Sequence, residues 1–253
     1  MLGQYSVLAP FYDSLNGRTF DYDGYADAVE KLLDQNGIPK GSLLLDLACG
    51  TGAMTLRLLK KGYDVIGVDL SPEMLGVCRE NCENEGFSPL LLCQDMCSLD
   101  LYGTVEAAVC CLDSVNYLSG DGELDILFSR LKNFISPGGL FIFDINTERK
   151  FTEIYANNVY TYDADGVFCV WQNSFDEKTR LCDFDLTFFI EEKKGLYRRA
   201  EEHQCERCYT VDEISSAAEN NLFTLEAVCR DVRFAPSDGS EERSYCICRR
   251  NKL

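Results

Sequence analysis

The sequence predicts an α/β protein with a doubly wound, mainly parallel sheet that an antiparallel β insertion interrupts after the fifth strand. Up to Ile145, short apolar runs alternate with stretches of helical period. From Val159 to Tyr209 the apolar residues instead alternate with period two, which is typical of antiparallel strands. Helical and strand patterns then return. We therefore expect residues 1–146 and 210–253 to form one α/β domain and residues 147–209 to form a β-rich insertion.

Apolar spacing and helix-end signals define the elements of the first part. The helix over Asp23–Asn36 carries an apolar face and ends before Gly37 and Pro39. Ser71 followed by Pro72 is typical of a helix start. The elements that follow the first helix are strand Ser42–Leu47, helix Thr51–Lys61, strand Asp64–Val68, helix Pro72–Glu85, strands Leu90–Cys93 and Ala107–Leu112, helix Gly122–Phe134 and strand Leu140–Ile145.

The insertion shows the two-residue period most clearly where Asp183 and Asp185 interleave with Phe184 and Leu186. Two further strands after the insertion bring the main sheet to seven. The predicted elements of this part are strands Tyr160–Tyr162, Val167–Phe175, Leu181–Ile190 and Leu196–Tyr209, helix Val211–Asn220, and strands near Leu225–Val232 and Ser244–Cys248.

The chain is strongly acidic, with 24 Lys and Arg against 42 Asp and Glu among 253 residues, a net charge of −18. Such a charge repels phosphate backbones and anionic lipid headgroups, so we expect neither nucleic acid nor membrane as a partner. A small molecule, cationic ones included, fits better; alternatively the acidity serves only solubility. The absence of a long apolar run or a signal-peptide pattern favours a cytoplasmic protein.

Fourteen cysteines raise the question of a metal site. Cys205 and Cys208 form one C-x-x-C, and Cys246 and Cys248 form a C-x-C. A structural zinc site usually shows two tight pairs with recognisable ligand spacing. Most of the other cysteines stand in apolar runs, where cysteine behaves as a small hydrophobic residue. We therefore expect no metal and no disulfide framework.

The strongest signal for function is Leu43–Gly52, LLLDLACGTG, in which a buried strand runs into a glycine-rich turn that opens a helix. A dinucleotide site would show G-x-G-x-x-G, but Thr55 stands where the third glycine is needed. The acid Asp46 beside the turn would also repel a pyrophosphate. It suits a cationic ligand such as the amino group and sulfonium of S-adenosylmethionine.

With these motifs, residues 40–150 resemble the class I S-adenosylmethionine-dependent methyltransferases, and DLACGTG is similar to their first motif. The resemblance implies a Rossmann-like fold and S-adenosylmethionine as the cofactor. Asp69 would bond the ribose hydroxyls and Asp95 the adenine amino group. The residues that the resemblance places at the cofactor are Tyr12, Asp46, Ala48, Cys49, Gly50, Gly52, Asp69, Leu70, Met74, Asp95, Met96, Leu112 and Asp113. On their own, Tyr12 could equally pack a helix and Asp113 form a turn.

The segments YSVLAPFYDSL, DSVNYL, FDINT and EEHQCERCY resemble a bacterial small-molecule subgroup similar to glycine and aminosugar N-methyltransferases. That subgroup carries a strand-rich lid, which here corresponds to residues 147–209. The resemblance implies methyl transfer to a nitrogen or oxygen of a small-molecule acceptor, for example an amine. Neither the acceptor nor the oligomeric state follows from the sequence.

An amine must be neutral to attack a methyl group, so a nearby base is expected. His203 and Tyr117 are the candidates, and Asp113, Asn116 and Asn146, from adjacent strand ends, could orient the acceptor. His203, the one histidine, would share a strand face with Arg199, Glu201 and Arg207. That face could instead be solvated and the histidine structural. Trp171, the one tryptophan, is expected in the core more than at the acceptor.

Two other classes of protein share parts of this pattern. A nicotinamide-dependent oxidoreductase has the same strand, glycine turn and helix, with an acid after the second strand. The missing third glycine and Asp46 both argue against it. A non-catalytic module that keeps the fold as a cofactor sensor is the other alternative.

Overall fold

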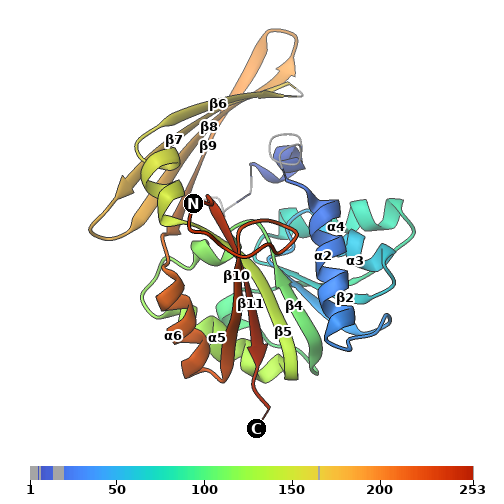
Figure 1. Ribbon diagram of the computed structural model, residues 1–253. Coiled ribbons are helices and arrows are strands. Elements are labelled where there is room, and N and C mark those ends of the chain that lie inside the picture. Colours follow the sequence, from blue (N-terminus) through green and yellow to red (C-terminus); the bar gives the residue numbers. More distant parts are fainter. Residues whose placement is uncertain (1–4, 6, 14–19, 165, 253) are drawn as a thin grey trace.

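The computed structural model describes residues 5, 7–13, 20–164 and 166–252, and its main body is a twisted sheet with helices on both faces (Figure 1). Over these residues the sheet has seven strands in the order β10-β11-β5-β4-β1-β2-β3. All pairs are parallel except those of β11, which runs antiparallel to β5 and β10. This confirms the predicted fold class. The strands are β1 (Leu43–Leu47), β2 (Asp64–Asp69), β3 (Leu90–Cys93), β4 (Val105–Cys110), β5 (Ile135–Asn146), β10 (Phe223–Cys229) and β11 (Arg243–Arg250).

The helices divide between the two faces of this sheet because its strands are apolar on both sides. On one face α2 (Tyr22–Gln35), α3 (Ala53–Lys60) and α4 (Pro72–Asn84) pack in sequence; on the other lie α5 (Glu123–Phe134) and α6 (Val211–Asn220). Short turns of 3₁₀ helix are η1 (Ala9–Phe11), η2 (Met96–Ser98) and η3 (Ser114–Tyr117). The predicted start of α4 is confirmed, since the Ser71 hydroxyl accepts a hydrogen bond from the Met74 amide at 3.2 Å.

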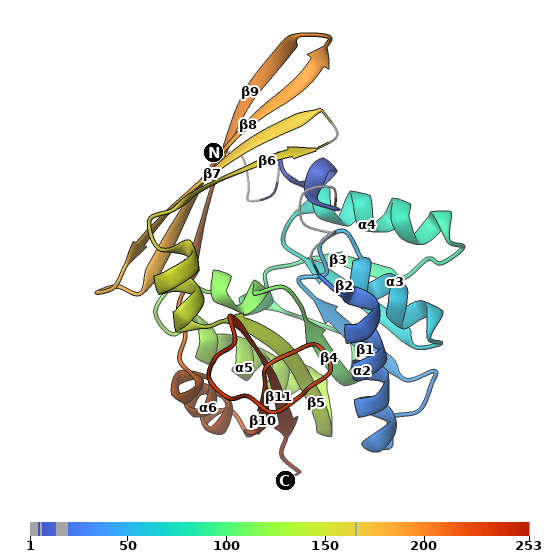
Figure 2. The same ribbon diagram turned by 45° about the horizontal axis from the view of Figure 1, so that its top comes forward.

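A second, antiparallel sheet follows β5 in the chain and extends away from the main body (Figure 2). Its strands pair in chain order: β6 (Val159–Ala164), β7 (Val167–Asp176), β8 (Leu181–Lys193) and β9 (Leu196–Arg207). On β8, Cys182, Phe184, Leu186 and Phe188 are buried and the residues between them are more exposed. The two-residue period therefore gives β8 one apolar inner face, as the sequence predicted.

Three details differ from the prediction. β4 ends at Cys110, before the predicted Leu112, because Leu112 and Asp113 have φ angles of +56° and +53°, which a strand cannot contain. β5 begins at Ile135, ahead of the predicted Leu140, and an irregular pairing between Val105 and Ala107 of β4 accommodates the extra residues. A π-type helix, η4 (Lys150–Tyr155), forms where the sequence indicated no element.

Several global properties bear on function. No helix within the described ranges has the length and apolar character needed to cross a membrane. Across those same ranges, no group of three or more His, Cys, Asp and Glu side chains is arranged to hold a metal ion. The fourteen cysteines, all at described positions, are free thiols.

Candidate active site

The glycine turn after β1 is held in a left-handed backbone conformation. Ala48, Gly50 and Gly52 have φ angles of +55°, +54° and +82°. Gly50 has open space where a side chain would stand and lines a cavity at the carboxyl ends of the strands. A Cβ on Gly52 would instead lie 2.4 Å from the Cys78 sulfur of α4. Glycine at position 52 therefore allows α3 to pack against α4, and the predicted contact of Gly52 with the cofactor stays a prediction.

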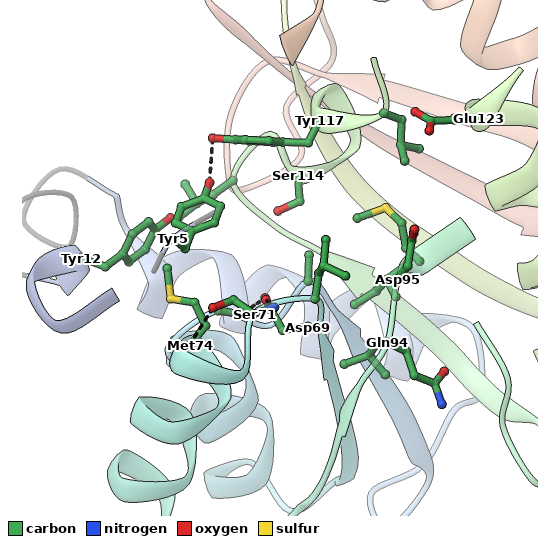
Figure 3. Close-up of a pocket in the computed structure, with 18 residues that line it drawn as sticks. Tyr5, Tyr12, Asp69, Ser71, Met74, Gln94, Asp95, Ser114, Tyr117 and Glu123 are labelled. Carbon is green, nitrogen blue, oxygen red and sulfur yellow. Dashed lines mark hydrogen bonds between the residues drawn. The ribbon is translucent and has the colours of Figure 1, made fainter. Parts of the chain in front are cut away.

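The cavity that Gly50 lines, called the first cavity, occupies about 240 Å³ above β1, β2 and β3 (Figure 3). It collects side chains from turns far apart in the chain, because parallel strands end at one edge of the sheet. The predicted cofactor residues that line it are Tyr12, Ala48, Gly50, Asp69, Leu70, Met74, Asp95, Met96 and Leu112.

Asp69 connects the segments that follow β1 and β2 at this cavity through two hydrogen bonds. Its Oδ2 accepts a hydrogen bond from the Gly50 amide at 2.8 Å, and its Oδ1 accepts one from the Ser71 amide at 2.8 Å. A carboxylate offers about four lone-pair sites, so each oxygen retains capacity for another donor. Burial raises the pKa of Asp69 although these backbone bonds oppose the shift.

Asp95 and Met96 lie at the opposite end of the first cavity, as Figure 3 shows for Asp95 relative to Met74. One oxygen of Asp95 accepts a hydrogen bond from the Cys97 amide at 2.8 Å and so caps η2. The first cavity thus has a carboxylate at each of two strand ends, with apolar side chains between them. This arrangement can hold a ligand that carries donors on both sides of a flat ring.

Asp46 lies deeper, beside a small third cavity that Cys49 and Tyr12 also line. The carboxyl group accepts a hydrogen bond from the Thr55 hydroxyl, and within the described part of the chain it has no cationic partner. Burial raises the pKa of Asp46 to about 7, so its charge is poised near neutral pH. A buried carboxylate of this kind suits a positively charged ligand group.

A second cavity of about 430 Å³ lies between the main body and the second sheet. It shares four lining residues with the first cavity, namely Tyr5, Tyr12, Leu112 and Tyr117. The two cavities are therefore neighbours separated by three tyrosines and a leucine. Strands β6 and β7 contribute Tyr160, Tyr162 and Trp171 to it, so Trp171, expected in the core, also faces a cavity.

Tyr117 stands at the junction of the two cavities. Its hydroxyl accepts a hydrogen bond from the Tyr5 hydroxyl at 2.6 Å (Figure 3). The same hydroxyl donates one to Gln204 Oε1 at 2.8 Å. The Gln204 amide in turn donates to Glu202, whose carboxylate also accepts the Tyr5 amide at 2.8 Å. This ring of bonds connects the N-terminal segment, η3 and β9. Burial raises the pKa of Tyr117, so the phenol stays protonated.

Leu112 and Asp113 keep their left-handed backbone because the Asp144 carboxylate accepts a hydrogen bond from each of their backbone amides, both at 2.8 Å. Arg243 pairs with Asp113 at 3.1 Å and also with Asp144. Burial alone would raise the pKa of Asp113, but Arg243 and then Lys150 lower it below its ordinary value. Asp113 had two predicted contacts, the cofactor and the acceptor; its side chain lines the second cavity and not the first.

Glu206 and Lys150 are two charged residues of the second cavity that the sequence did not indicate. Glu206 is 1% exposed, and its Oε2 accepts a hydrogen bond from the side-chain Nδ2 of Asn146 at 2.9 Å. Burial, reinforced by the charge of Asp113, raises the pKa of Glu206 well above its ordinary value. Lys150 donates to Asn146 Oδ1 at 2.9 Å and lies 5.0 Å from the centre of the Tyr155 ring.

The prediction that His203 faces the cleft is wrong. Its side chain is 59% exposed and contacts Asp185 at 3.0 Å and Asp183 at 3.4 Å on the outer face of the second sheet. The neighbouring residues Glu202 and Gln204 point inward because side chains alternate along a strand.

The prediction that Asn116 orients the acceptor is also not supported by its contacts. Asn116 is fully buried. Its Nδ2 donates a hydrogen bond to the Arg207 carbonyl at 2.8 Å, and its Oδ1 accepts one from the backbone N–H of Asn146 at 3.0 Å. Both of its polar groups are therefore used to join η3 to β9 and β5. Of the three predicted catalytic residues, Tyr117 alone lines a cavity in the described part of the chain.

The chain is similar in sequence and fold to known proteins. A family model described as a methyltransferase domain matches residues 44–139. The crystal structure of an S-adenosylmethionine-dependent methyltransferase from Clostridium acetobutylicum ATCC 824 is 30% identical, with a TM-score of 0.88 over 98% of this chain and 99% of that one. A Bacillus subtilis (strain 168) protein named for methyltransferase activity, YqeM, is 28% identical over 98% of both chains.

A further relative matches over half of its length. The dTDP-3-amino-3,6-dideoxy-alpha-D-glucopyranose N,N-dimethyltransferase of Streptomyces fradiae is 31% identical over 53% of this chain and 51% of that protein. The glycine turn, the acids at successive strand ends and the near full-length match to a solved enzyme lead to one conclusion. The chain belongs to the S-adenosylmethionine-dependent methyltransferases, and S-adenosylmethionine is its cofactor.

Proposed function

We propose that the enzyme methylates an amine nitrogen of a small molecule that binds in the second cavity. The observation that carries the proposal is the contact between the two cavities, which share Tyr5, Tyr12, Leu112 and Tyr117. Two ligands that occupy these cavities would meet at Tyr117. Direct transfer of a group between them needs such proximity.

The first cavity would hold the cofactor along its length. Asp69 would accept the ribose hydroxyls on the lone pairs that Gly50 and Ser71 leave free, and Asp95 would accept the adenine amino group. Asp46 would stabilise the positive charge near the methionine end. The cofactor, when bound, supplies a methyl group activated by a sulfonium, which the lone pair of the acceptor displaces.

Glu206 is the residue best suited to take a proton from the acceptor. An amine reaches the enzyme mostly as an ammonium ion, and its lone pair becomes available only when that proton leaves. A carboxyl whose pKa is raised by burial is a stronger base than an ordinary one. Asn146 fixes its orientation, because the side-chain Nδ2 of Asn146 donates to Glu206 Oε2 at 2.9 Å.

The relatives support nitrogen over oxygen as the acceptor atom. The Streptomyces fradiae protein is named for dimethylation of an amino sugar, and a relative from Halorhodospira halochloris, 28% identical over 48% of this chain, is named for glycine and sarcosine N-methylation. The second sheet, within residues 147–209, would act as the lid that excludes water and shapes the acceptor cavity.

The test is transfer of labelled methyl from S-adenosylmethionine to a panel of amino sugars, amino acids and matched alcohols. Glu206→Gln should lower turnover on the preferred amine by about 10²–10⁴-fold, because a base is lost. Glu201→Gln is the matched control, since that side chain is 63% exposed on the outer face of the same strand. Labelled alcohols without labelled amines would refute a nitrogen acceptor. Unchanged turnover in Glu206→Gln would refute its role as the base.

A further inference from the structure

The side-chain amide of Asn146 connects two carboxyl groups that line the second cavity. Its Nδ2 donates hydrogen bonds to Asp113 Oδ2 at 2.6 Å and to Glu206 Oε2 at 2.9 Å. A side-chain NH₂ group has two hydrogens, so one bond to each carboxyl uses both of them. Asn146 is fully buried at the end of β5. Asp113 and Glu206 are therefore bridged through a single nitrogen atom.

The two bridged carboxyls have different neighbours. Arg243 contacts Asp113 Oδ1 with both of its terminal nitrogens, each at 3.1 Å, whereas Glu206 has no arginine or lysine in ion-pair contact within the described residues. Two carboxyls at one site disfavour each other's charge. Burial opposes the charge on Asp113, but Arg243 holds its pKa below the ordinary value. Burial and then the charge of Asp113 raise the pKa of Glu206.

Lys150 of η4 approaches this bridge from the oxygen side of the amide. Its Nζ donates to Asn146 Oδ1 at 2.9 Å and lies 5.0 Å from the centre of the Tyr155 ring. The face of an aromatic ring attracts an ammonium group. Burial and then Arg243 lower the pKa of Lys150, while the charges of Asp113 and Glu206 oppose that shift. The amide is thus held at its oxygen by Lys150 and at its nitrogen by the two carboxyls.

Titratable groups from several elements surround Glu206. Burial raises the pKa values of the tyrosines and cysteines among them, so these groups stay protonated at neutral pH. The charges that remain are those of Asp113, Arg243 and Lys150. The neighbours are Tyr5 of the N-terminal segment, Asp113 after β4, Tyr117 of η3, Lys150 and Tyr155 of η4, Cys182 of β8, Cys205 of β9 and Arg243 of β11.

We propose that Asp113 and Glu206 act as one carboxyl pair that holds a single proton, and that Lys150 is the positioning residue of this pair. The inference rests on the proposed function in taking Glu206 as the base. Glu206 can take a proton from an ammonium only as a carboxylate, because its O–H bond forms as the N–H bond of the acceptor breaks. The charge of Lys150, held in place by Asn146, favours that carboxylate and keeps Glu206 reactive closer to neutral pH.

Infrared spectroscopy tests this without an acceptor, because a protonated carboxyl shows a C=O band that a carboxylate lacks. The band that Glu206→Gln removes belongs to Glu206, and raising the pH should abolish it at a midpoint above the ordinary range of a glutamate. In Lys150→Met this midpoint should move to higher pH by about one pH unit, since a nearby opposite charge lowers a carboxyl pKa by roughly 1–3. Lys150→Arg keeps a positive charge and a donor for Asn146, so its midpoint should stay at the wild-type pH.

Lys178→Met is the control for the loss of one positive charge, because Lys178 is exposed in the turn between β7 and β8. Its midpoint should equal that of the wild type. If Lys150→Met fails to fold by circular dichroism, Lys150→Gln removes the charge but keeps a polar end, and its midpoint should also move to higher pH. An unchanged or lower midpoint, a shift in Lys150→Arg as large as in Lys150→Met, or no such band in the wild type would overturn the inference.

Methyl transfer separates this inference from the proposed function. On an amine that the enzyme methylates, turnover of Lys150→Met should fall about tenfold at pH values below both infrared midpoints and recover above them, because only the carboxylate form is a base. A shifted infrared midpoint without methyl transfer to any amine would support the carboxyl pair with Lys150 and refute the amine acceptor. Methyl transfer that Glu206→Gln abolishes, with a pH profile that Lys150→Met leaves unchanged, would support the proposed function and refute the role of Lys150.

Discussion

Replacing Asp69 by asparagine should weaken cofactor binding strongly, because each oxygen of this carboxylate accepts a backbone hydrogen bond and is expected to accept a second one from the ribose. Oδ2 accepts the Gly50 amide and Oδ1 accepts the Ser71 amide, both at 2.8 Å. Asp69 lines the first cavity, so we expect its remaining lone pairs to be available to the cofactor there. In Asp69→Asn, an NH₂ group replaces one oxygen and must face one of these two backbone donors. The backbone amide of either Gly50 or Ser71 therefore loses its hydrogen-bond acceptor. One ribose hydroxyl of the bound cofactor is expected to lose its acceptor as well.

The size of the effect follows from the hydrogen bonds involved. A hydrogen bond to a charged group contributes about 1.5–3 kcal/mol, and a neutral one about 1 kcal/mol. The substitution removes one charge-assisted bond to the ribose and makes the other neutral, a total loss of roughly 2–5 kcal/mol. At about 1.4 kcal/mol for each factor of ten, affinity should fall roughly 30- to 4000-fold.

Calorimetry with S-adenosylhomocysteine measures this loss, and urea unfolding shows whether the variant still folds. Asp64→Asn is the matched control, since Asp64 is exposed at the opposite end of the same strand. It should bind like the wild type. An Asp69→Asn protein that folds and binds with wild-type affinity would refute the assignment of Asp69 to the ribose.

Three further predictions follow from the geometry. Because a cationic ligand favours the ionised form of Asp46, whose pKa is about 7, S-adenosylmethionine should bind about tenfold more weakly at pH 6 than at pH 8; calorimetry on Asp46→Asn should lack that part of the pH dependence. Gly52→Ala should lower the free energy of unfolding by about 1–3 kcal/mol more than Gly37→Ala, because both have positive φ but a Cβ on Gly52 alone meets Cys78. Ala48→Gly should retain cofactor affinity in calorimetry, since glycine adopts the observed φ of +55° without strain.

The first cavity could be predicted from the sequence because local signals build it. Asp69 directly follows the apolar run of β2, Gly50 follows β1, and Asp95 follows β3. Parallel strands place all these ends at one edge, so a correct strand assignment places the side chains as well. Gly52 has a packing role that the sequence did not reveal, because a glycine in such a turn can admit either a ligand or a neighbouring helix. The sequence does not show that Cys78 of α4 lies against it.

The second cavity could not be predicted because its charged residues are far apart in the chain and lack a local motif. Lys150 lies on η4, Glu206 near the end of β9, and Arg243 at the start of β11. Only the packing of the second sheet over the main body brings them together. The sequence could not decide between cofactor and acceptor for Asp113 for the same reason, since it shows neither Arg243 nor Asp144 turning this residue toward the second cavity.

Which side chains of β9 face the second cavity depends on one extra residue of β8, near the turn that joins the two strands. Lys193 pairs with Leu196 across the turn, and if that register continued, Leu186 of the inner face would pair with His203. The pairing shifts by one between Glu191 and Lys193, so that Leu186 pairs with Glu202 instead.

This bulge turns every later side chain of β9 to the opposite face and brings Glu206 into the second cavity. Both faces of β9 are polar, so hydrophobic alternation could not reveal the shift from the sequence. His203→Ala should accordingly leave turnover and its pH profile unchanged, measured beside Glu206→Gln on the same acceptor. A loss of activity in His203→Ala, with the fold intact, would mean that the bulge is absent when the enzyme works.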